Sequence, residues 1–581
     1  MINLQGRKIS ILKIWTTVRI VLVCSAMLLS AGCQTHKNAK PNVILLMADD
    51  MGWAQTGYYG YPIMKTPNLD AMARNGLRMD RFYAGAPSCT PTRATVLTGR
   101  SNDRTGAFRV GQYINKQEKM LSSAFKDAGY ATAHFGKWHL NKTRFSASEH
   151  PLSADDPHGP GKLGFDYWLS NTNGFDIFDL NSGEHELSRN GVIERFEGDG
   201  SEVLVEEALK YISQQVAVQR PIFVVIWYSA PHGPWEASDA DIEPFLGKVD
   251  RTSANMLGEI VAMDRSIGSL RKGLRDLGIA ENTLVWFTSD NGGTPDIDTR
   301  VTFKEAEDGQ LIRDSLEYPS NCSDEIDHDL TSLEARKLFG CYRGVDPDSG
   351  GHLRGFKKDF YEGGLRVPTI IEWPEGIKSR VSKFPSGTVD IFPTMIEIAG
   401  LSPTSINSVH DGISIAEVFE KEPVQRDKPL GFRANDGRAW LDNDWKLLQN
   451  VLLVDGKLVK GPFELYNIIG DPGEEILRFM AKVGISDTSD EVLQNYIYFK
   501  LNFEKAGQPR KMKSMFGTIE SPVKTKDYAP EKIIKDFMVY VYGMRSDAIP
   551  TAPLGWRLED DEHLEGFKAV MEKSASILDS I

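Results

Sequence analysis

The chain has 581 residues, of which 41% are hydrophobic and 25% are charged, and its formal net charge is −13 at pH 7. This length is enough for a large hydrophobic core together with a second domain. The acidic balance argues against a general nucleic-acid-binding surface, so we predict no nucleic-acid partner. An anionic substrate would need a basic pocket inside an acidic protein.

The first segment has the pattern of an export signal. A basic stretch from Arg7 to Arg19 precedes a largely apolar run, Ile20 to Leu29, which is too short to span a bilayer. The run Leu29-Ser30-Ala31-Gly32-Cys33 resembles the cleavage box of bacterial lipoproteins. We therefore predict a lipoprotein signal peptide over residues 1–33 and a polar tether over 34–40. The protein would be exported, to the periplasm or cell surface, and would touch the membrane only through a lipid on Cys33. A plain secretory signal is the alternative.

Four continuous apolar runs, each followed by polar residues, predict the strands of a parallel sheet. In chain order they are Val43–Met47 before Asp49 and Asp50, Tyr130–Ala133 leading to Lys137 and His139, Ile222–Trp227 before His232, and Leu284–Thr288 before Asp290 and Asn291. In open α/β sheets, ligands bind beyond the C-terminal ends of the strands. All four polar clusters are therefore candidates for one site.

Helical patterns between these runs complete the predicted fold class. Pro67–Arg74, Glu202–Gln214 and Met256–Leu277 have helical character, and strand–helix alternation is typical of a doubly wound α/β fold with helices on both faces of a mostly parallel sheet. Residues 141–200 are predicted to be mostly loop, and 295–349 to be a long charged insertion.

The sequence changes character after about residue 425. Arg438–Leu448 predicts two strands around a turn at Asp442-Asn443. We therefore predict a catalytic domain over residues 41–425 and a smaller α+β subdomain with an antiparallel sheet over 426–581.

The stretch Pro87–Arg100 predicts a helix that begins beside a cysteine. Thr90 is a suitable N-cap and Pro91 a suitable first helical residue, which would put Cys89 at the helix N-terminus. The helix dipole and free N–H groups there favour anions and lower a thiol pKa. Arg93, one turn later, could point to the same place. The alternative is a small buried cysteine that only packs before the helix.

Asp49, Asp50, Asp290 and Asn291 predict a metal site. They supply only oxygen ligands, which suit the hard cations Ca²⁺ and Mg²⁺ better than zinc. A single Asp after a strand is more often a turn residue or a helix cap. Two acidic clusters at two strand ends favour an ion.

These motifs together resemble the type I sulfatases, formylglycine-dependent enzymes of the alkaline phosphatase superfamily. The resemblance is carried by Cys89-Thr90-Pro91-Thr92-Arg93 with Thr98-Gly99-Arg100, by Gly136-Lys137-Trp138-His139-Leu140, by Ala230-Pro231-His232-Gly233-Pro234, and by Leu353-Arg354-Gly355-Phe356-Lys357. Phe463–Asn467 is similar to the family's C-terminal subdomain, which is a small antiparallel sheet with a helix.

The resemblance implies a cofactor set and a nucleophile. A maturation enzyme would convert Cys89 to formylglycine, whose hydrate is the nucleophile in this family. One Ca²⁺ would be bound by Asp49, Asp50, Asp290, Asn291 and the modified Cys89.

The resemblance also implies roles for the remaining residues. Arg93, Lys137 and Lys357 would stabilise negative charge on the sulfonyl oxygens. Asp290 would help to deprotonate the nucleophile, and His232 or Lys357 would protonate the leaving alcohol. His139 would take the proton whose removal releases sulfate.

We therefore predict a sulfuric ester hydrolase that acts on a sulfated carbohydrate. A phosphonate or phosphate ester hydrolase on the same scaffold and a non-catalytic glycan-binding lipoprotein are the alternatives. Cys322 and Cys341 are the cysteines left without a role, and export to an oxidising compartment predicts a disulfide between them. Two reduced thiols are the alternative.

Overall fold

The computed structural model describes residues 40–61, 63–141, 152–173, 187–233, 235–249, 251–294, 302–305, 311–314, 353–454, 457–469, 474, 512–514 and 517–519. Everything described below belongs to the compact unit that begins at Pro41. None of the described helices combines the length and the apolar character needed to cross a membrane. Cys33, Cys322 and Cys341 lie outside the described residues, so the lipid and disulfide predictions are not tested.

A ten-stranded sheet forms the centre of the unit, in the order β13-β2-β12-β9-β1-β8-β4-β5-β6-β7. Its strands are β1 Asn42–Ala48, β2 Leu77–Met79, β4 Ala131–Lys137, β5 Tyr167–Asn171, β6 Leu187–Arg189, β7 Val192–Glu194, β8 Ile222–Trp227, β9 Thr283–Ser289, β12 Ile370–Glu372 and β13 Arg380–Ser382. The five central strands, from β9 through β5, are parallel. All four predicted strands are therefore confirmed, and they are neighbours.

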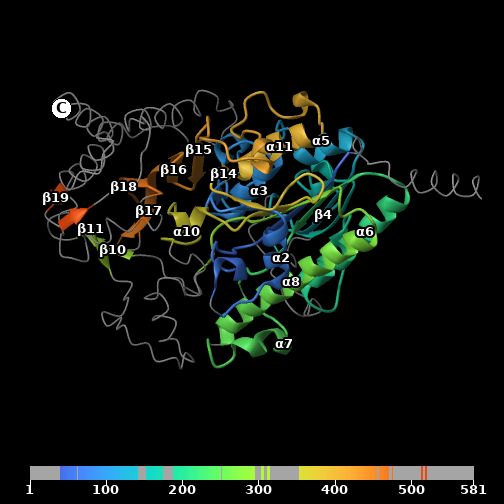
Figure 1. Cartoon of the computed structure of the whole chain (residues 1–581), viewed down its shortest axis with the longest axis horizontal. Coiled ribbons are helices and arrows are strands. Elements are labelled where there is room, and N and C mark those ends of the chain that lie inside the picture. The colour runs from blue at the N-terminus through green and yellow to red at the C-terminus, as the bar shows by residue number, and fades with distance from the viewer. Residues whose placement is uncertain are drawn as a thin grey trace, which may run out of the picture. The chain divides into compact units, whose positions relative to one another are not determined.

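Helices cover both faces of this sheet (Figure 1). The helices are α2 Pro67–Asn75, α3 Cys89–Thr98, α4 Asn102–Thr105, α5 Leu121–Asp127, α6 Gly200–Ala217, α7 Asp239–Ile242, α8 Arg251–Asp276, α10 Glu362–Leu365 and α11 Ile391–Ile398. Side chains alternate along β1: Ile44 and Leu46 pack in the core under α6 and α8, while Val43 and Leu45 pack in the core under α3, α5 and α11. The predicted doubly wound fold is confirmed.

A second, largely antiparallel sheet contains β15 Leu430–Ala434, β16 Gly437–Asp442, β17 Trp445–Val454 and β18 Lys457–Asn467. Asp442 faces Trp445 in the register of β16 and β17, and Asn443 between them has φ 52°. The predicted hairpin is therefore correct. Strands alone occur among the described residues of this region, so the helix implied there is not tested.

Two pairs of short strands lie outside these two sheets. β3 Phe82–Tyr83 pairs with β14 Ser386–Gly387, and β19 Met512–Ser514 pairs with β20 Gly517–Ile519.

The prediction for residues 141–200 was partly wrong. β5 lies within this range and pairs with β4 over five positions, and β6 and β7 extend the sheet from it. These strands are short and lie among Gly, Pro and Asp residues, so their stability comes from long-range pairing that a local pattern does not show.

Two short strands also occur in the predicted insertion. β10 Thr302–Glu305 pairs with both β11 Leu311–Asp314 and β17. Part of the insertion therefore joins the second sheet.

Candidate active site

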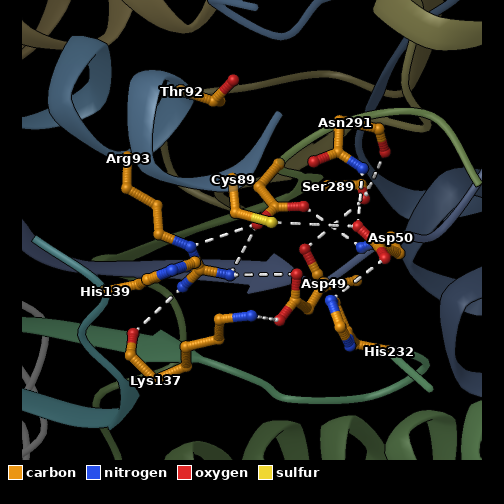
Figure 2. Close-up of polar contacts among 12 residues, drawn as sticks. Asp49, Asp50, Cys89, Thr92, Arg93, Lys137, His139, His232, Ser289 and Asn291 are labelled. Carbon is orange, nitrogen blue, oxygen red and sulfur yellow. Dashed lines mark hydrogen bonds and ion pairs between the residues drawn. The ribbon is translucent and has the colours of Figure 1, made fainter. Parts of the chain in front are cut away.

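The predicted site residues meet where the central strands end (Figure 2). Asp49 and Asp50 follow β1, Lys137 ends β4, and Asp290 follows β9. His139 and His232 follow β4 and β8, and the N-terminus of α3 brings Cys89 to the same place. Parallel strands end at one edge of the sheet, so side chains separated by more than 200 residues become neighbours.

Cys89 is the first residue of α3 and is 1% exposed. Its Sγ lies 4.0 Å from Oδ1 of Asp50. Burial raises the pKa of the Cys89 thiol, and Asp290 opposes ionisation further although Lys357 favours it. The expected lowering of this pKa was therefore wrong, because loss of water outweighs the helix terminus.

The predicted N-cap was also wrong. Ser88 occupies the cap position, and the hydroxyl of Thr90 donates instead to the backbone oxygen of His139 at 2.9 Å. This bond joins the first turn of α3 to the segment after β4. Thr90 therefore links two segments of the site and does not cap the helix.

Arg93 bridges the two acidic clusters and has no exposed surface. Its Nη2 lies 2.7 Å from Oδ2 of Asp290 and 3.5 Å from Oδ1 of Asp49. Its Nη1 donates to the backbone oxygen of Lys137 at 3.0 Å. The guanidinium also lies 5.1 Å from the ring centroid of Trp227.

Two lysines pair with one carboxylate oxygen each of Asp49 and Asp50. Lys137 donates from Nζ to Oδ2 of Asp49, and Nζ of Lys357 lies 2.6 Å from Oδ2 of Asp50. Burial opposes ionisation of Asp49, but Lys137 and other nearby cationic groups outweigh it and lower the pKa of this carboxyl. Burial raises the pKa of Asp290 to about 7, with Asp49 adding to the effect and Arg93 opposing it.

Both predicted histidines lie in the site. Nε2 of His232 lies 3.5 Å from Oδ2 of Asp50, and Nδ1 is 2.7 Å from the backbone oxygen of Gly233. Burial lowers the pKa of His232 to about 4, with Lys357 adding to the effect. His139 is 2% exposed, and its ring nitrogens have no hydrogen-bond partner within the described part of the chain. Burial and the nearby Lys137 lower its pKa.

The predicted metal ligands fit a hard cation. Oδ1 of Asp49 and Oδ1 of Asn291 are buried and have no hydrogen-bond partner among the described residues, so two oxygens have unused lone pairs. Asn291 Nδ2 donates to Oδ1 of Asp50 at 2.7 Å, which places this amide against the carboxylate. One ligand atom each from Asp49, Asp50, Cys89 and His232 lies within 4.8 Å of the others. The site therefore has oxygen donors of the kind that Ca²⁺ prefers, with a nitrogen of His232 among them.

Several supporting residues had no sequence signal. Ser289 accepts a hydrogen bond from the Met51 amide at 3.0 Å, and Thr294 donates to Oδ2 of Asp50 at 2.5 Å. Ser and Thr are common near strand ends, and only the fold shows that these two orient the acidic cluster. Asp50 and His139 have φ values of 66° and 52°, so the backbone itself is constrained at the site.

Comparison with known proteins identifies the family. The Sulfatase family profile matches residues 41–401, a range that contains all the residues above. This chain belongs to the sulfatase family. The N-acetylgalactosamine-6-sulfatase of Canis lupus familiaris is 33% identical over 427 residues, covering 68% of this sulfatase and 69% of that relative. The ulvan-active sulfatase of Formosa agariphila is 24% identical over 577 residues, covering 94% and 95% of the two chains.

A solved structure shows the same fold. The crystal structure of Ps i-CgsB in complex with k-i-k-neocarrahexaose has a TM-score of 0.61 at 22% identity, covering 92% of this sulfatase and 98% of that chain. The predicted reaction class, sulfuric ester hydrolysis, is confirmed by the family.

Proposed function

We propose that this sulfatase removes sulfate from a sulfated carbohydrate, with Cys89 converted to formylglycine and one Ca²⁺ bound beside it. The observation that carries the proposal is the convergence of Arg93, Lys137 and Lys357 around a buried Cys89 at a helix N-terminus. This arrangement concentrates positive charge where a sulfonyl group would meet the nucleophile.

The environment of Cys89 supports its modification. A cysteine attacks as the thiolate, and burial among carboxylates raises the pKa of this thiol, so the unmodified residue is a poor nucleophile. Formylglycine would supply a hydrated aldehyde, which attacks through oxygen. A formylglycine-generating maturation enzyme is therefore the expected partner of the newly made chain.

Asp49, Asp50, Asp290 and Asn291 would hold the calcium ion, together with the modified residue 89. Its chemistry would be that of a Lewis acid, which lowers the cost of negative charge near the reacting oxygens. When Asp290 is ionised, three carboxylates face three cations among the described residues of the site, so their charges balance. A divalent ion adds net positive charge and favours the binding of an anionic sulfate ester.

The other side chains have separable tasks in this proposal. Arg93 and Lys137 bind the sulfonyl oxygens. Burial of Lys357 opposes its charge, but the nearby Asp50 raises the pKa of Lys357, so Lys357 stays cationic. Burial lowers the pKa of His232, but an adjacent sulfate ester would raise it and so promote protonation. We therefore assign to His232 the proton that the leaving alcohol receives, and to His139 a proton acceptor during sulfate release.

The substrate class follows from the relatives. One relative is an N-acetylgalactosamine-6-sulfatase and another is an ulvan-active sulfatase, and the Ps i-CgsB structure contains a neocarrahexaose. The compound named in each case is a carbohydrate, and the two relatives are named as sulfatases.

Paired assays test the proposal. Sulfate release should be measured across sulfated mono- and oligosaccharides, with an aryl sulfate and the matching aryl phosphate and phosphonate esters in parallel. We expect release from at least one sulfated sugar, loss of activity on chelation and recovery with Ca²⁺. In co-expression with a maturation enzyme, the tryptic peptide Phe82–Arg93 should be lighter by about 18 Da. Full activity at the unmodified mass would refute the role of formylglycine, and preference for the phosphate or phosphonate ester would refute the substrate class.

A further inference from the structure

The loop that carries Lys357 has an unusual backbone. The residue after it, Lys358, has φ 81°, a left-handed backbone conformation that residues other than glycine rarely adopt. The Lys357 amide donates to the backbone oxygen of Gly293 at 3.0 Å, and the Lys358 amide donates to Pro87 at 2.8 Å. The loop is thus fastened to the metal-binding segment on one side and to the segment before Cys89 on the other.

Such a conformation persists only when its surroundings impose it. The loop is packed closely on itself, since a Cβ on Gly363 would lie 2.1 Å from the backbone oxygen of Gly355. Tyr83 on β3 and Glu474 each bond Glu362 at the end of the loop. Further side-chain anchors come from the second sheet, which lies outside the strands that form the catalytic edge.

Four buried side chains of the second sheet hold the loop: Lys446 and Asn450 on β17, and Glu464 and Tyr466 on β18. We call them the clasp. Asn450 lies at an irregularity in the pairing of β17 with β18, and its Oδ1 accepts the amide of Phe360 at 2.7 Å. An irregularity of this kind redirects a side chain that would otherwise follow the regular strand pattern.

The other clasp residues hold the two ends of the loop. Nζ of Lys446 lies 3.0 Å from Oε1 of Glu362, the residue where α10 begins. Glu464 accepts the Tyr361 hydroxyl at 2.9 and 3.1 Å. At the other end, Arg354 donates to the Tyr466 hydroxyl at 3.0 Å.

We propose that the clasp is a positioning device for Lys357, so that the second sheet is part of the catalytic apparatus although none of these four side chains touches the reacting groups. The proposal rests on the role assigned to Lys357 above. A displacement of about 1 Å in a catalytic group can lower the rate about 100-fold, and the clasp limits such displacement by fixing both ends of a strained loop.

The first test is the mobility of the loop. Hydrogen exchange should be measured by mass spectrometry on peptides covering residues 356–361 in the wild-type protein and in Glu464→Ala. The matched control is Glu372→Ala, which removes a similarly buried carboxylate paired with Arg271 at 2.7 Å. Glu372 ends β12 and faces Val285 of β9, near the end of β9 that is opposite to the site. We expect faster exchange at the Lys357 and Lys358 amides in Glu464→Ala only.

The second test is a double-mutant cycle on kcat, measured with an activated aryl sulfate. We expect Glu464→Ala to lower kcat about 10- to 100-fold in the wild-type background and to have almost no further effect in Lys357→Met. Tyr466→Phe removes a single hydroxyl and should give the same pattern with a smaller decrease in kcat. This variant keeps the test decisive if Glu464→Ala does not fold.

Two results would overturn the proposal: unchanged exchange at both lysine amides, or an equal fold-loss of kcat with and without Lys357. A wild-type protein without sulfatase activity would instead refute the proposed function, and the exchange experiment would still decide whether the clasp holds the loop.

Discussion

Replacement of Arg93 by methionine should make the stability of the protein unusually dependent on calcium. Arg93 has no exposed surface and pairs with Asp290 and Asp49, which are also fully buried. Removing one partner of a buried ion pair leaves uncompensated charge and costs about 3–5 kcal/mol. The shift in unfolding temperature is this free energy divided by the entropy of unfolding. For residues 41–401 the unfolding temperature should fall by about 4–7 °C.

Calcium should recover part of this loss, because the variant presents the same three carboxylates with one cation fewer. The divalent ion then meets a site with net negative charge. We expect it to bind at least tenfold more tightly than in the wild type, a difference of about 1.4 kcal/mol or more. Catalysis should still be lost, since calcium does not replace the contact of a guanidinium with a sulfonyl oxygen.

Thermal unfolding in chelator and in a series of Ca²⁺ concentrations measures this effect. Arg426→Met is the matched control, because Arg426 is also fully buried and binds both oxygens of buried Asp390, at 2.7 and 2.8 Å. Both variants should lose similar stability in chelator. The calcium-induced rise in unfolding temperature should exceed that of the wild type in Arg93→Met and equal it in Arg426→Met. The same rise in both variants would refute the charge balance inferred for the site.

Three further predictions concern other parts of the chain. Burial raises the pKa of Glu474 from 4.5 to about 8, with Glu362 adding to the effect and Lys446 opposing it. Ionisation of Glu474 therefore lowers the stability of the folded protein progressively as the pH rises from about 4.5 to about 8. The stability of Glu474→Gln relative to wild type, from urea unfolding, should therefore increase between about pH 5 and pH 8, and a constant difference would contradict the shift. His232→Ala should slow sulfate esters of poor leaving groups at least about 100-fold while slowing an activated aryl sulfate much less; equal losses on both would argue against a general acid. Cys33→Ser should move the protein from the membrane fraction to the soluble fraction of its host, as judged by immunoblotting after ultracentrifugation, and an unchanged distribution would exclude the lipid anchor.

The local pattern of the sequence was enough to place most of the groups that we propose to be catalytic. Uninterrupted β-rich runs before Asp49, Lys137, His232 and Asp290 identified adjacent parallel strands, and the ends of such strands share one edge of the sheet. A short motif around Cys89, through its resemblance to the sulfatases, supplied Arg93 and the position of the proposed nucleophile. These features are encoded by residues close together in the chain, so a reading of the sequence recovers them.

The tertiary structure decided everything that depends on long-range contact and on loss of water. Cys89 was expected to have a lowered pKa from its helix terminus, but burial beside carboxylates raises the pKa, and burial is a property of the folded chain alone. The sequence predicts loop where β5 lies, because only its pairing with β4 makes this segment a strand. The clasp could not be inferred at all. Lys446 and Glu464 lie 84 and 103 residues after the residues that they hold, in a sheet whose alternating pattern gives no sign of its partner. Local propensity and motif spacing therefore determine which groups can react, whereas packing determines their charge state and their position.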